Sequence, residues 1–101
     1  MEIVSSQTNV FLEIASKIIR EQELVVGPLA WSEAGKVQGL KIVDSKKGEI
    51  VFDNGDQKSV IDRLVNQYDR LFGQASHEVS REAAAPLVAD LSPSEVPSSL
   101  Q

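Results

Sequence analysis

Apolar residues in the first part of the chain recur at intervals of three and four. This spacing places them on one face of a helix and predicts a helix over residues 6–22. The face is formed by Phe11, Ile14, Ala15, Ile18 and Ile19. Glu13 and Lys17 fall on the opposite side, where they form a favourable i,i+4 pair. The pattern is typical of a helix that covers the core of a soluble domain.

The pattern changes over the next segment, residues 23–37. Residues 23–26 are expected to form a short strand or extended segment that Gly27-Pro28 ends. Because proline is favoured at the first position of a helix, a short helix is predicted over residues 28–36. A strand over the same residues is the alternative, since Gly35 is unfavourable inside a helix.

A β-hairpin is predicted next. Two apolar, largely β-branched runs, residues 40–43 and 50–52, flank a polar loop over residues 44–48 that ends in Gly48. Asn54-Gly55 readily adopts positive φ and turns the chain. Asp56 or Ser59 is then expected to cap the helix that follows.

That helix carries the widest apolar stripe in the chain, from Val60 to Phe72. The stripe continues in phase beyond Gly73, through Ala75, Val79 and Ala83. Two interpretations fit: one long helix passes through Gly73, or a second helix begins near residue 76 after a bend. In either case proline at position 86 should end or kink the helix that precedes it.

Composition changes at Pro86. Residues 86–101 contain three of the four prolines, and serines separate their apolar residues. This composition predicts a mobile tail, in which residues 87–91 are the candidates for a helical turn. The remainder, residues 1–85, is expected to form a single domain.

These elements predict an α+β fold, in which an N-terminal and a long C-terminal helix pack on a small antiparallel sheet of two or three strands. An isolated two-stranded hairpin is marginally stable. We therefore expect residues 24–26 to add a third strand, or a second copy of the chain to complete the structure. The excess of apolar helix around residues 68–83 favours a homodimer.

Charge and composition exclude or disfavour several classes of function. Lys and Arg number 10 against 15 Asp and Glu in 101 residues, a net charge of −5. This balance disfavours binding to nucleic acid or to an anionic membrane. The absence of cysteine excludes disulfides, zinc fingers, iron–sulfur ligation and thiol catalysis. Without a signal-peptide pattern or a long apolar run, we expect a soluble, cytoplasmic protein.

Catalytic motifs are missing from the sequence. No phosphate-binding loop, dinucleotide fingerprint or nucleophile elbow is present. His77 is the only histidine, and we expect it at the surface or at a helix seam. Asp53, Asn54 and Asp56 do not continue into a calcium loop, and turn and capping chemistry explains them. The sequence therefore predicts no enzymatic activity, no cofactor and no bound metal.

The leading hypothesis is a protein-binding or regulatory module. Its candidate contact residues are Trp31, Tyr68, Phe72, Val79, Ala83, Leu87 and Leu91. The alternative is a small-molecule sensor or accessory subunit with a pocket lined by Trp31 and Tyr68. The third hypothesis is a transcription-associated domain that touches DNA through the Lys46-Lys47 turn or the helix over residues 28–36.

Overall fold

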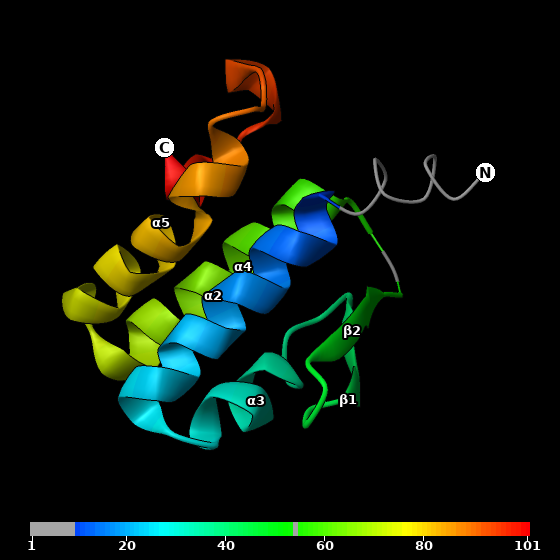
Figure 1. Cartoon of the computed structure of the whole chain (residues 1–101), viewed down its shortest axis with the longest axis vertical. Helices are drawn as coiled ribbons and strands as arrows, with labels where there is room; N and C mark the ends of the chain where they lie inside the picture. Colours follow the sequence, from blue (N-terminus) through cyan, green and yellow to red (C-terminus); the bar gives the residue numbers. More distant parts are fainter. Residues whose placement is uncertain (1–9, 54) are drawn as a thin grey trace.

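A computed structural model describes residues 10–53 and 55–101 (Figure 1). In chain order its elements are α2 (Val10–Val26), α3 (Leu29–Ala34), β1 (Leu40–Asp44), β2 (Glu49–Phe52), α4 (Gln57–Phe72), α5 (Gln74–Val88) and the short 3-10 helices η1 (Pro93–Glu95) and η2 (Ser98–Leu100). The predicted α+β class is confirmed.

Helices α2, α4 and α5 lie side by side and form the main layer (Figure 1). The hairpin flanks α2 on the side away from α5, and α3 connects α2 to β1 (Figure 1). The apolar faces read from the sequence meet in one core. Its fully buried large side chains include Ile14, Ile18, Ile19, Val60, Ile61, Leu64, Val65 and Tyr68.

The first helix extends further than predicted. Residues 23–26 continue α2, so the expected strand there is wrong. The backbone N–H of Gly27 still donates to the carbonyl of Glu23 at 2.8 Å, as in a helix. Adding residues to a formed helix costs little, and Gly27 ends it at a positive φ of 76°. The predicted start at residues 6–9 lies outside the described residues.

The short helix and the hairpin agree with prediction. Helix α3 spans Leu29–Ala34, so the alternative strand over these residues is wrong. Strands β1 and β2 pair antiparallel, with Leu40 opposite Phe52 and Ile42 opposite Ile50. Within residues 10–53 and 55–101 the sheet has these two strands and no third.

Gly73 separates two helices. Its φ of 87° and ψ of −172° interrupt the helical path, so α4 ends at Phe72 and α5 starts at Gln74. The interpretation with a second helix is therefore correct. At the other end of α4, the carboxylate of Asp56 accepts the backbone N–H of Ser59 at 3.1 Å, as predicted for the cap.

The C-terminal segment lies on the domain. Helix α5 runs through Pro86 to Val88, so the domain boundary expected at that proline falls inside a helix. Beyond it, η2 packs on α4, and Leu100 is 7% exposed. The carboxylate of Asp62 accepts hydrogen bonds from the Ser98 hydroxyl and the Ser99 backbone, both at 3.0 Å. Composition predicted a mobile tail over residues 86–101; these contacts place its end against α4, and its mobility stays a prediction.

Candidate functional site

Two of the predicted contact residues belong to the core. Tyr68 is fully buried and Trp31 is 9% exposed. Neither lines any of the four cavities described below. None of these four cavities corresponds to the small-molecule pocket predicted beside these two residues, and that pocket stays a prediction. Phe72 packs on Tyr68 with ring centroids 6.4 Å apart, and Leu87 and Leu91 lie half-buried against the core.

Two other predicted residues, Val79 and Ala83, line a groove between α2 and α5. The groove has a volume of about 450 Å³. We call it the α2–α5 groove. Its walls are Lys17, Glu21, Leu24 and Val25 from α2 and Val79, Glu82, Ala83 and Pro86 from α5.

Leu24 and Val25 are the residues of this groove that sequence reasoning missed. Leu24 is 80% exposed and Val25 is 65% exposed, the highest values among the exposed large apolar side chains of the described residues. Leu24 follows Lys17 by seven residues and Glu21 by three, so it shares their polar face of α2. An apolar residue on the charged face of a helix was the available signal, and it required extending the helix to Val26.

Small residues let α5 approach α2. The α5 side of this helix pair consists largely of Ser76, Ser80, Ala83 and Ala84, all buried. Gln22, buried on α2, donates from its amide to the Ser76 carbonyl at 2.8 Å and to the Ser80 hydroxyl at 3.0 Å. A buried polar contact of this kind favours one register of the two helices. These contacts of Gln22 fix the position of α5 against α2 at the bottom of the α2–α5 groove.

The rim of the α2–α5 groove carries both signs of charge. Lys17 and Glu21 form an ion pair at 3.3 Å on α2. Glu82 on α5 forms no ion pair with another described residue. An apolar centre with a mixed-charge rim is the usual composition of a protein-binding surface.

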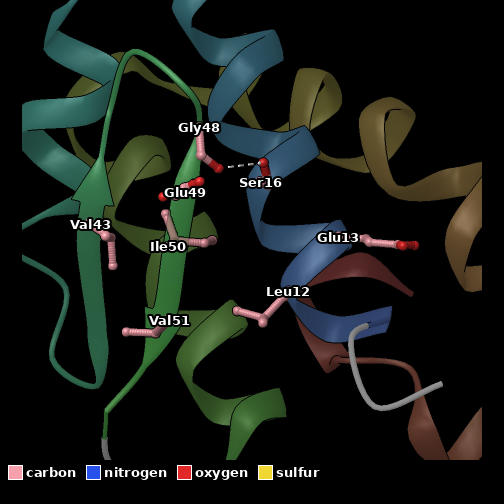
Figure 2. Close-up of a pocket in the computed structure, with 8 residues that line it drawn as sticks. All are labelled: Leu12, Glu13, Ser16, Val43, Gly48, Glu49, Ile50 and Val51. Atoms are coloured by element: carbon pink, nitrogen blue, oxygen red, sulfur yellow. Dashed lines mark hydrogen bonds between the residues drawn. The ribbon is translucent and has the colours of Figure 1, made fainter. Parts of the chain in front are cut away.

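A second cavity lies between α2 and the hairpin. It has a volume of about 430 Å³, and Figure 2 shows Leu12 directed from α2 toward β2 while Glu13 points away. The Ser16 hydroxyl donates to the Gly48 carbonyl at 3.4 Å and links α2 to the end of the hairpin loop (Figure 2). Val43 and Val51 also line this cavity, and they are 56% and 39% exposed.

The other two cavities adjoin α4 and share Asp69. The larger, of about 570 Å³, lies between α4 and the segment after α3 and is lined mainly by polar residues. The smaller, of about 360 Å³, lies at the α4–α5 junction beside Gly73 and His77. His77 occupies the helix seam, and its Nδ1 lies 2.6 Å from the Asp69 carboxylate.

Among the described residues, two side chains have pKa values that depart from their ordinary range. Burial raises the pKa of Tyr68, and the nearby charge of Glu33 adds to the effect. The pKa of Glu33 is lowered, first by the hydrogen bond from Gln67 and then by the one from Lys36. Both groups hold α3 against α4, because Gln67 lies on α4 and donates to Glu33 at 2.8 Å. Their shifted pKa values have structural causes.

Turn chemistry explains the other polar residues noted in the sequence. Asp44 accepts the backbone N–H groups of Lys46 and Lys47 at 3.0 and 3.3 Å, which closes the hairpin loop. Asp56 caps α4, and Asn54 lies outside the described residues. In the described part of the chain, no three His, Cys, Asp or Glu side chains are grouped as a metal site requires. The same residues contain no helix long and apolar enough to cross a bilayer.

Comparison with known proteins adds no relative. No family model matches the chain, and no curated protein or solved structure matches it significantly.

Proposed function

We propose that this protein is a non-enzymatic protein-binding module that forms a homodimer through its α2–α5 groove. The observation that carries the proposal is the exposure of Leu24 and Val25 at the groove, 80% and 65%. Moving a leucine or valine side chain fully out of water contributes about 2 kcal/mol. A two-fold dimer would cover the pair twice, once in each copy.

The rim charges favour a second copy of this chain as the partner. A two-fold axis brings the same surface of both copies together. Lys17 of one copy then lies within reach of the carboxylate at position 82 of the other, and the contact is formed twice. Like charges need not face one another in this arrangement, because Lys17 and Glu82 stand on opposite walls of the groove.

The area of the α2 and α5 surface sets the expected affinity of the dimer. Helix α2 has 17 residues, and at 1.5 Å per residue it is about 25 Å long. Two neighbouring helices of about 10 Å diameter then offer a projected face of about 500 Å². Stable interfaces bury about 800 Å² on each partner. We therefore expect a dimer that dissociates at micromolar concentration.

Sedimentation velocity across the range from low micromolar to near-millimolar protein tests the proposal. A concentration-dependent shift from monomer to dimer is expected. Leu24→Asp should abolish this shift while leaving the thermal unfolding temperature nearly unchanged, because the side chain is 80% exposed. Leu71→Asp is the matched control, since Leu71 is also exposed, at 47%, but lies outside the groove.

Charge reversal tests the orientation of the dimer. Lys17→Glu and Glu82→Lys should each weaken the dimer, and the double variant should restore it, because the opposite charges then meet again. A wild-type protein that stays monomeric at every concentration would overturn the proposal. Dimers that tolerate Leu24→Asp would place the interface elsewhere.

A further inference from the structure

The polar groove beside α4 has a charge opposite to that of the chain. Its lining is Lys36, Val37, Gln38, Arg63, Asn66, Gln67, Asp69 and Arg70. Three of these side chains are cations and one is a carboxylate, whereas the whole chain carries 15 acids against 10 bases. We call this surface the arginine groove.

The carboxylates at the groove are already engaged by other partners. Asp69 lies 2.6 Å from Nδ1 of His77 through its Oδ2 atom, whereas its buried Oδ1 has no hydrogen-bond partner in the described residues. Glu33, at the margin, accepts from Gln67 at 2.8 Å through one oxygen and from Lys36 at 3.1 Å through the other. Neither acid forms an ion pair with Arg63 or Arg70, although the charge of Arg70 contributes to the lowered pKa of Glu33.

Arg63 and Arg70 bind neutral oxygens instead. Arg63 donates to the carbonyl of Gln38 at 3.1 Å, and Arg70 donates to the side-chain oxygen of Gln67 at 2.6 Å. Neither forms an ion pair with another residue of the described ranges. A guanidinium has five N–H donors, so each arginine keeps donors for a further acceptor while one bond fixes its direction.

Their spacing suits an elongated anion. Arg70 follows Arg63 by seven positions on α4, which is two helical turns or about 10 Å along one side of the helix. Asn66 lies between them and offers an amide to the middle of a ligand. The groove volume of about 570 Å³ falls within the range of small-molecule sites.

We propose that the arginine groove binds a small organic phosphate with at least two linked phosphate groups. Guanidinium groups match phosphate oxygens in pairs, and two of them held along one helix face balance a charge of two or more. Lys36 lines the same groove but is paired with Glu33 at 3.1 Å, so the two arginines supply the charge for the ligand. This ligand site is independent of the dimer interface, because it shares no lining residue with the α2–α5 groove.

Titration with inorganic phosphate, pyrophosphate and tripolyphosphate, followed by amide NMR shifts, tests the proposal. Affinity should rise with each added phosphate, and the largest shifts should fall on residues of the arginine groove. Arg63→Ala and Arg70→Ala should each weaken tripolyphosphate binding about tenfold or more. The matched controls are Arg20→Ala and Arg81→Ala, which remove the same charge outside the groove and should leave affinity within about twofold.

Circular dichroism melts establish that each variant is folded before it is titrated. Equal loss of affinity in all four variants would show general attraction of anions and overturn the site. Saturable binding whose shifts map to another surface, or no binding at millimolar tripolyphosphate, would overturn it as well. Lysine substitutions at positions 63 and 70 supply a second measurement. They keep the positive charge but lose the planar guanidinium group that binds phosphate through two N–H donors. The affinity for tripolyphosphate should fall in these variants if the site is specific, and it should stay unchanged if anions are attracted only by charge.

Discussion

The hydroxyl of Tyr68 donates a hydrogen bond of 2.6 Å to the carbonyl oxygen of Ala30 and so ties α4 to α3 inside the core. The ring is fully buried. Burial favours the neutral phenol, which raises the pKa of Tyr68. This contact gives the only tyrosine of the chain a structural role inside the core.

Replacing Tyr68 with phenylalanine removes that bond and keeps the ring. We expect the free energy of unfolding to fall by about 1 kcal/mol at neutral pH. Because the pKa of Tyr68 is higher in the folded protein, its contribution is complete below the unfolded value of about 10 and is lost as pH rises above it. Guanidinium unfolding at neutral and strongly alkaline pH measures both effects. A difference between the two proteins that stays constant into the alkaline range would contradict this account.

Glu33 makes stability depend on pH in the acidic range, as Tyr68 does in the alkaline range. Its pKa is lowered by Gln67 and Lys36, so the ionised form contributes stability above the unfolded pKa of about 4.3. This contribution is lost as pH falls through the lower folded value. Glu33→Gln should therefore be less stable than wild type at neutral pH and equally stable in strong acid. Urea midpoints at the two pH values check the expectation, with Glu23→Gln as a control on an exposed carboxylate of α2.

Asp62 should decide whether the C-terminal segment stays on α4. Its carboxylate receives the Ser98 hydroxyl and the Ser99 backbone N–H, both at 3.0 Å. Asp62→Ala leaves these donors without their acceptor, and we expect faster amide exchange and faster proteolysis over residues 92–101. Asp90→Ala, at an exposed position outside this network, is the control. If exchange over this segment is already fast in wild type, the segment is mobile as its composition predicts.

The parts of the fold that could be predicted from the sequence are those that have a pattern in neighbouring residues. The hairpin and the helices α2, α3 and α4 have periodic apolar residues or turn residues of their own, so each was predicted near its observed position. The packing of the C-terminal segment depends on Asp62, which lies 36 residues before Ser98 in the chain. Contacts at such separation leave no periodic signal, and composition alone favoured a mobile tail.

The residues of the candidate sites likewise fall into those that a local pattern predicted and those that only folding brings together. Val79 and Ala83 continue an apolar stripe, and they were predicted as contact residues. Leu24 was missed because residues 23–26 were predicted as a strand, whereas α2 continues to Val26 and ends before Gly27, which has a φ of 76°. The arginine groove was missed because Lys36 comes from the segment after α3 and Arg63 from α4. Only folding brings these cations together.

Gly73 offers a sharp test of the break between α4 and α5. At its φ of 87° and ψ of −172° a side chain is strained, although an added Cβ would meet no atom within 4 Å. Gly73→Ala should therefore lower the free energy of unfolding by about 1–3 kcal/mol through backbone strain alone. Chemical unfolding with fluorescence detection of Trp31 measures the change.

Gly35 is the matched control for this substitution. It has a helical φ of −65°, and its added Cβ would lie at ordinary contact distances, the nearest being 3.5 Å from the Ser32 carbonyl. Gly35→Ala should stabilise the protein by about 0.4–1 kcal/mol, because alanine restricts the unfolded chain without straining the folded one. The two substitutions thus have opposite expected signs. An unchanged or higher stability in Gly73→Ala would mean that α4 and α5 join into one straight helix, which would carry α5 away from Gln22 and remove the α2–α5 groove.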